Sequence, residues 1–196
     1  FDHQPIDVQQ FLLPTSILDR LNADLCTAML YPETPPDNVT LTQKHQKLIT
    51  NLESSNLFII PLDRERYWYR YHHLFADLLR RRLHQTQPAW VPTLHLRASE
   101  WYEQRGYDDE AIEHALQAGE FQRAARLIEK DADALWGRGE HAKLRHWLAA
   151  LPLEMACSRP ELCVYHTWYL FLGGQQEAAE RTLQVAEQAI TSSTDD

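Results

Sequence analysis

Glycine recurs at a nearly constant spacing in the second half of this 196-residue chain, and the spacing restricts the folds that the chain can adopt. Gly106, Gly139 and Gly174 are separated by 33 and 35 residues. Five residues after Gly106, Gly119, Gly139 and Gly174, in that order, stand the apolar residues Ala111, Ala124, Leu144 and Ala179 of helix-like segments. Because glycine accepts the left-handed conformation that ends many helices, the spacing predicts helical hairpins in which each glycine lets the chain reverse.

A period of roughly 34 residues, with one helical hairpin in each period, is typical of tetratricopeptide repeats. Alanines in these segments allow close helix contact, and large aromatic side chains fill the wider gaps. We expect these aromatic residues to pack in the core or between hairpins rather than to form a ligand platform: Trp101, Tyr102, Trp136, Trp147 and Trp168. Residues 87–196 are therefore predicted to form tetratricopeptide-like α-helical hairpins.

The first part of the chain also shows helical periodicity. Apolar residues recur every three or four positions over residues 7–30, and Pro14-Thr15-Ser16 interrupts them. Because proline disfavours continued helix and hydroxyl groups can cap a new one, we expect a short helix, a turn, and a second helix that begins near Ser16. After a proline-rich loop over residues 31–36, a third helix is predicted for residues 40–54, with His45 on its buried face.

The periodicity changes after the third helix. Residues 57–62 and 67–71 are short runs rich in aromatic and β-branched side chains around a polar turn, which predicts a β-hairpin. A further helix is expected from His73 to Leu79, continuing into the arginines at 80–82, which complement the dipole at that helix end. Three small helices followed by a hairpin describe a winged-helix arrangement. The predicted fold is mainly α, with a winged-helix-like domain over residues 1–86 and the repeat region over residues 87–196.

The distribution of charge argues against nucleic-acid binding. The net charge is −9; residues 1–86 carry 9 basic and 10 acidic side chains, and residues 87–196 carry 10 and 18. Proteins that bind nucleic acid draw much of their affinity from neutralised phosphates, so we expect no direct nucleic-acid binding and favour a protein partner. No stretch is long and apolar enough for a membrane helix, and the first residues do not resemble a signal peptide, so a cytoplasmic location is expected.

Motifs that carry chemistry are missing from the sequence. It contains no GxxxxGK[ST] phosphate loop, no HExxH and no glycine-rich nucleophile elbow, so we expect neither catalytic residues nor ATP hydrolysis by this chain alone. The three cysteines, Cys26, Cys157 and Cys163, form no CxxC pair and lie in or beside apolar stretches. They are expected to be buried thiols, without a disulfide or a zinc site.

Several short motifs along the whole chain are together far more specific than any one of them. They are residues 11–18 (FLLPTSIL), 25–26 (LC), 56–58 (NLF), 61–63 (PLD), 68–75 (WYRYHHLF), 94–95 (LH), Ala98, 101–102 (WY), 111–116 (AIEHAL), 118–119 (AG), 124–125 (AA) and 151–152 (LP). With these motifs the chain resembles the middle of the MalT-like group of large, ATP-dependent, LuxR-family transcription activators, which are STAND-type signalling ATPases.

The resemblance implies an arrangement of domains. In that family a nucleotide-binding domain precedes the winged helix, a sensor of helical repeats follows it, and a helix-turn-helix at the far C-terminus reads DNA. This chain is then expected to be a central, non-catalytic fragment. The implied partners are the neighbouring ATPase domain and an inducer or regulatory protein on the repeat surface. ATP or ADP is implied for the full-length protein, and no cofactor for this fragment.

His72 and His73 are the candidate nucleotide-contacting residues. They stand where a predicted strand meets a helix N-terminus, and the free amides and dipole there favour a phosphate. In related ATPases a histidine in a Met-His-Asp motif contacts the β-phosphate of ADP and holds the off state. Tyr71-His72-His73 resembles that motif with its first and third residues replaced, so either histidine could take the role. A histidine that only caps the turn is the structural alternative.

Three functions are compatible with these features. In the first, the winged helix responds to nucleotide in an ATPase domain and the repeats bind an inducer or inhibitory protein, so that the segment relays both signals to the DNA-binding domain. In the second, the chain is a free-standing helical-repeat scaffold for protein partners. In the third, the winged helix binds DNA, which the charge distribution disfavours. The regulatory relay is the leading hypothesis.

Overall fold

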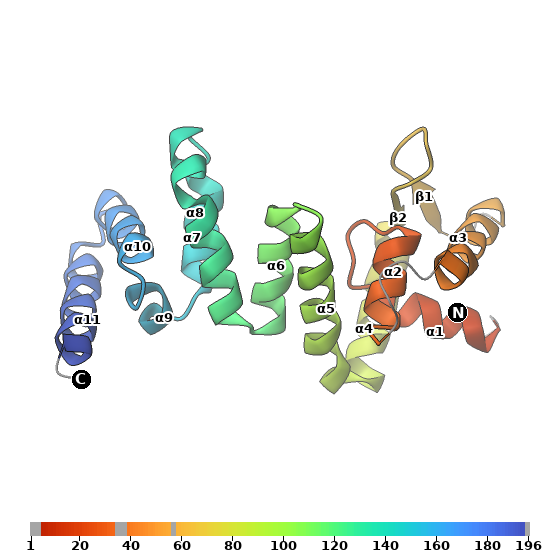
Figure 1. Cartoon of the computed structure of the whole chain (residues 1–196), viewed down its shortest axis with the longest axis horizontal. Helices are drawn as coiled ribbons and strands as arrows, with labels where there is room; N and C mark the ends of the chain where they lie inside the picture. Colours follow the sequence, from red (N-terminus) through yellow and green to blue (C-terminus); the bar gives the residue numbers. More distant parts are fainter. Residues whose placement is uncertain (1–4, 34–38, 56–57, 195–196) are drawn as a thin grey trace. The chain divides into compact units, whose positions relative to one another are not determined.

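The structure, a computed structural model, describes residues 5–33, 39–55 and 58–194. The chain divides into two compact units, Phe1–Arg105 and Gly106–Asp196. In the described part the structure is almost entirely helical, and its one sheet has two strands (Figure 1). This agrees with the predicted fold class, a mainly α chain with a winged-helix-like module followed by helical hairpins.

The first unit has the element order of the predicted winged helix. Its helices and strands are α1 (Ile6–Thr15), α2 (Ala23–Leu30), α3 (Val39–Ser54), β1 (Ile59–Pro61), β2 (Tyr69–Tyr71), α4 (His73–Thr86), the 3-10 helix η1 (Pro88–Trp90) and α5 (Val91–Gln104). Strands β1 and β2 are antiparallel, with Ile59 opposite Tyr71. Both predicted strands are therefore present, although Leu57, where the first was expected to begin, lies outside the described residues, as do 34–36 of the predicted loop.

The second helix begins later than the sequence suggested. We expected it near Ser16, but α2 starts at Ala23, with the Asn22 Oδ1 atom accepting a hydrogen bond of 2.8 Å from the Leu25 amide. The hydroxyl of Ser16 instead donates to the Leu13 carbonyl at the end of α1, at 2.6 Å. Between the helices, Leu21 exchanges two backbone hydrogen bonds with Tyr69, of 2.8 and 2.9 Å. The residues after Ser16 thus extend the sheet edge rather than a helix.

Side chains from the helices and from the sheet pack together in the core of the first unit. Leu21, Leu25 and Met29 are fully buried, and the Thr15 and Tyr71 hydroxyls share a hydrogen bond of 2.7 Å between α1 and β2. Helix α5, which we assigned to the repeat region, packs on α2 in this unit. Its Tyr102 hydroxyl donates to the Arg20 carbonyl at 3.0 Å. The compact unit therefore ends at Arg105, and the domain assignment with a boundary at residue 86 stays a prediction.

The second unit consists of helices joined by tight turns. They are α6 (Asp108–Ala118), α7 (Phe121–Gly137), α8 (His141–Ala150), α9 (Leu153–Cys157), α10 (Pro160–Leu172) and α11 (Gln176–Thr194). Helix α6 packs beside α7, α7 beside α8, and α10 beside α11 (Figure 1).

The turn glycines behave as the repeat predicted. The four glycines Gly106, Gly119, Gly139 and Gly174 all have φ between 74 and 76°. Residues with side chains rarely adopt this left-handed conformation, so glycine is needed there. The apolar residues five positions further on are buried, with exposed fractions of 0 to 4%. The glycine pattern therefore located the reversals correctly.

None of the described helices is long and apolar enough to cross a membrane.

Candidate functional site

His72 is held in place by its main chain. It is the N-cap residue of α4, with φ −59° and ψ 135°, and its amide donates a 2.6 Å hydrogen bond to the Phe58 carbonyl. Its own carbonyl accepts hydrogen bonds from the Phe75 and Ala76 amides, each at 2.9 Å. The backbone of His72 therefore connects the end of the hairpin to the first turn of α4 and fixes the direction in which the side chain leaves.

The imidazole of His72 does not cap its own helix. The side chain makes no capping hydrogen bond, and its ring lies 4.4 Å from the ring of His73, centroid to centroid. His72 is half-buried and His73 is exposed. In the described part of the chain the His73 and Leu74 amides make no backbone hydrogen bond, as expected at a helix start. The structure thus brings two imidazoles and unpaired amides to one place.

An apolar surface that the sequence analysis missed adjoins this junction. Phe58 is 53% exposed and stacks on Phe75, with ring centroids 4.9 Å apart. Leu74 and Leu78, one turn apart on α4, are also largely exposed. Phe58 has a φ of 59°, which is unusual for a bulky side chain. The sequence did contain a sign of this surface, because α4 carries more leucines than the two that are buried, Leu79 and Leu83.

Of the three arginines at 80–82 on α4, Arg80 has partners near the turn after α1. Arg80 Nε donates to the Ser16 carbonyl at 2.7 Å, and its Nη2 atom pairs with Asp19 at the same distance. Arg80 therefore stabilises the turn after α1. Arg81 and Arg82 are exposed.

The remaining candidates for chemistry are dispersed. Among the described residues no group of three or more His, Cys, Asp or Glu side chains could hold a metal ion. The three cysteines are buried and free. Burial raises the pKa of the Cys157 thiol to about 12, so little of the reactive thiolate exists at neutral pH. The absence of a metal site and of catalysis in the whole protein stays a prediction.

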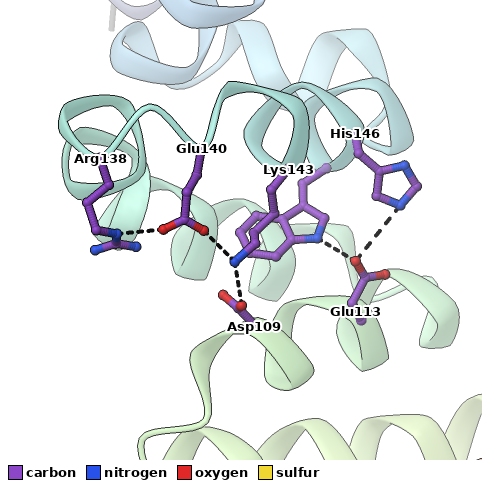
Figure 2. Close-up of polar contacts among 7 residues, drawn as sticks. Asp109, Glu113, Arg138, Glu140, Lys143 and His146 are labelled. Carbon is purple, nitrogen blue, oxygen red and sulfur yellow. Dashed lines mark hydrogen bonds and ion pairs between the residues drawn. The ribbon is translucent and has the colours of Figure 1, made fainter. Parts of the chain in front are cut away.

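In the second unit, polar contacts join residues that are one repeat apart (Figure 2). Lys143 Nζ lies 2.6 Å from Asp109 Oδ2 and 2.7 Å from Glu140 Oε2. Trp147 Nε1 donates to Glu113 Oε1, also at 2.6 Å. The Lys143–Asp109 and Trp147–Glu113 pairs, which connect α8 with α6, are each separated by 34 residues, and His146 also contacts Glu113, at 3.8 Å and 33 residues away. The period of the sequence therefore corresponds to a physical contact between equivalent positions of successive hairpins.

A second set of contacts joins α7 to α10. Arg159 pairs with Glu129, and the Tyr165 hydroxyl donates to Asp133. The hydrogen bond to Asp133, and to a lesser extent burial, raise the pKa of Tyr165 to about 12. Trp136 packs against the rings of Tyr165 and His141, at 5.3 and 4.6 Å. These contacts hold α7 against α8 and α10.

One aromatic prediction was wrong. Trp101, Tyr102 and Trp147 are buried as expected, but Trp168 is 47% exposed. Helix α10 is apolar on more than one side, and the following residues form an exposed stripe along it: Val164, Trp168, Phe171 and Leu172. A helix with two apolar faces fits contact with a further element or partner.

Comparison with known proteins agrees with this architecture. Residues 1–91 match the family model of the MalT winged helix domain. This range contains α1 to α4 and the hairpin, so the chain has a MalT-like region, and the predicted resemblance is confirmed to that extent.

The whole chain is similar to a particular larger protein. It is 30% identical over 184 residues to serine/threonine-protein kinase PknK of Mycobacterium tuberculosis, in each of two strains. The match covers 94% of this chain and 16% of PknK. The chain thus spans about a sixth of the length of these relatives.

Proposed function

We propose that this chain is a non-catalytic regulatory segment of a LuxR-family, ATP-dependent transcription activator. In this proposal the winged helix responds to ATP or ADP in a neighbouring ATPase domain. The helical repeats bind an inducer or a regulatory protein, and the segment relays both signals to the DNA-binding domain. The observation that carries the proposal is the position of His72, within the MalT-like region, at a helix start where its imidazole is not used for capping.

The proposed relay is a shift between two states. With ADP bound, His72 or His73 donates a hydrogen bond to a phosphate oxygen, and the first-turn amides of α4 add theirs. A ligand on the repeats then favours the state in which these contacts are broken. A preference of a few kcal/mol suffices for such a shift, and an extended repeat surface can supply it.

The relative PknK is named as a kinase, which suggests a broader form of the proposal. The matched segment is a small part of PknK, so a similar segment would serve proteins with different output domains. The alternative of a free-standing scaffold draws support from the exposed stripe on α10. It is less favoured, because a repeat scaffold alone has no use for a MalT-type winged helix.

The test is His72→Ala in the natural protein that contains this segment together with its ATPase domain. We expect ADP to bind roughly ten- to one-hundredfold more weakly, since one charge-assisted hydrogen bond contributes about 1.5–3 kcal/mol. The full-length protein should also shift toward its active state. Calorimetric titration with ADP and thermal unfolding measure the two effects separately.

His84→Ala is the matched control, because His84 is an exposed histidine in the last turn of the same helix. It should leave ADP affinity unchanged. If His72→Ala lowers the melting temperature while ADP affinity is retained, His72 is structural and the sensing role is wrong. If neither quantity changes, His73→Ala decides whether the second histidine has the role.

We also expect negligible affinity of this chain for duplex DNA. Residues 1–86 have 9 basic against 10 acidic side chains, and the remainder is strongly acidic, so few phosphates can be neutralised. A fluorescence titration with labelled duplex at low salt should show no saturation in the micromolar range. Submicromolar, salt-dependent binding would instead support a DNA-binding winged helix.

A further inference from the structure

A large cavity lies in the first unit, and neither the His72 junction nor the repeats use it. Its volume is about 1010 Å³, and it is formed by α1, α3 and the 3-10 helix η1 together with the end of α2. The lining residues on which the argument depends are Phe11, Tyr31, Lys44, His45, Lys47 and Trp90. Cavities that bind small molecules commonly have volumes of roughly 300–1,000 Å³, so this one is large enough for a small ligand.

The polar centre of the cavity wall is His45, which is only 4% exposed. Its Nδ1 atom lies 2.7 Å from the Thr27 hydroxyl, which uses its own proton to donate to the Ala23 carbonyl. With the Thr27 proton directed to the Ala23 carbonyl, we assign the imidazole proton to Nδ1, which donates to Thr27. The other ring nitrogen, Nε2, is then an acceptor, and it makes no hydrogen bond among the described residues. A molecule in the cavity with a donor group can satisfy it.

The walls on either side of His45 are aromatic. The Phe11 ring lies 5.5 Å from the imidazole, and the Tyr31 ring stacks on it at 5.7 Å with an angle of 26° between the planes. Tyr31 and Trp90 are each 40% exposed, which leaves part of each ring uncovered. Uncovered aromatic faces beside a buried acceptor favour a flat ring that carries a hydrogen-bond donor.

Positive charge is placed at the rim. Lys44 and Lys47 are exposed residues on α3 that line the cavity, and neither forms an ion pair within the described ranges. Asp7 is the acidic residue of the lining on α1. Burial, and to a lesser extent Lys44, lower the pKa of His45 to about 4, so the imidazole is neutral at pH 7 and keeps its acceptor. The cavity thus combines an apolar, aromatic interior with two ammonium groups that suit a carboxylate.

We propose that this cavity binds a small aromatic carboxylate whose ring carries an N–H or O–H donor. The ring lies against Tyr31 and Trp90, the donor bonds to His45 Nε2, and the carboxylate is held by Lys44 and Lys47. The proposal is independent of the nucleotide relay, because it involves neither His72 nor the ATPase domain. It gives the winged helix a ligand of its own.

Binding is tested on the 196-residue chain with indole-3-acetate, which has a flat ring, a ring N–H and a carboxylate. Titration followed by calorimetry or by NMR should show saturable binding with a dissociation constant below about 1 mM. Naphthalene-1-acetate, which lacks the N–H, should bind at least about threefold more weakly, since one net hydrogen bond is lost. Indole-3-acetamide, which lacks the charge, should bind about tenfold more weakly.

The lysine contribution is tested with the double variant Lys44→Gln and Lys47→Gln, whose exposed sites should tolerate the change. It should weaken indole-3-acetate binding about tenfold and leave indole-3-acetamide unaffected. The double variant Arg64→Gln and Arg70→Gln removes the same charge from exposed positions outside the cavity, and should bind as the parent does. No saturation by indole-3-acetate, or equal affinity in both double variants, would overturn the proposal.

Discussion

Replacing Trp147 by alanine is expected to lower the free energy of unfolding of the repeat unit by about 3–5 kcal/mol, as truncation of a large buried aromatic residue does. Trp147 is 1% exposed, lies on α8, and donates through Nε1 to Glu113 on α6. Its removal leaves a cavity between two hairpins and breaks a contact between equivalent repeat positions. Denaturant unfolding followed by circular dichroism measures the change, and amide hydrogen exchange shows whether it is confined to residues 106–196.

Trp168→Ala is the matched control, because it removes the same side chain from a position that is 47% exposed. Its effect should stay below about 1 kcal/mol, as for most surface substitutions. Trp147→Phe should lie between the two, since it keeps an aromatic ring and loses the hydrogen bond. If Trp147→Ala and Trp168→Ala lowered the free energy of unfolding equally, burial of the Trp147 side chain would not be what stabilises the repeat unit.

The first unit is expected to lose about 2 kcal/mol of stability between pH 7 and pH 5 through His45 alone. Burial, more than the nearby Lys44, lowers the pKa of His45 from 6.5 to about 4. Below pH 6.5 the unfolded chain therefore binds a proton that the folded chain does not bind. The free energy of unfolding then decreases as the pH is lowered, until the pKa of the folded state is reached. Burial is also the chief cause that lowers the pKa of His95 to about 4, so His95 likewise reduces the stability of the first unit as the pH is lowered.

Denaturant unfolding of the parent chain and of His45→Gln at pH 7 and at pH 5 isolates this contribution. Glutamine can still donate to the Thr27 hydroxyl but does not titrate, so the variant should lose about 2 kcal/mol less over the same interval. His84→Gln, which alters an exposed histidine, should behave as the parent chain. An identical pH dependence in all three proteins would show that His45 is not buried as a neutral group.

The strand-to-helix junction at His72 could be predicted from the sequence, and its surroundings could not. The change from strand to helix at Tyr71-His72-His73 is encoded within a few residues, so His72 stands at the N-cap of α4 as that pattern implies. The exposed Phe58 ring beside it depends on stacking with Phe75, seventeen positions away. Likewise, the cavity around His45 is formed by α1, α3 and η1, and no periodicity predicts how such segments leave space between them.

Within the described residues, the sequence by itself determined the helical hairpins, their turns and the β-hairpin, because these depend on local properties. Gly119 ends α6 since glycine accepts a φ of 74°, and that preference is independent of the rest of the chain.

Only the tertiary structure decided where α2 begins and on which unit α5 packs. The residues after Ser16 pair with β2 through Leu21 instead of forming a helix, since a backbone partner 48 residues away satisfies their hydrogen bonds. Helix α5 has the same periodicity as the repeat helices, and its Arg97 and Tyr102 side chains bond to carbonyls of Met29 and Arg20 in the first unit. A local pattern predicts that a buried face exists, but the partner of that face is chosen by contacts between distant segments.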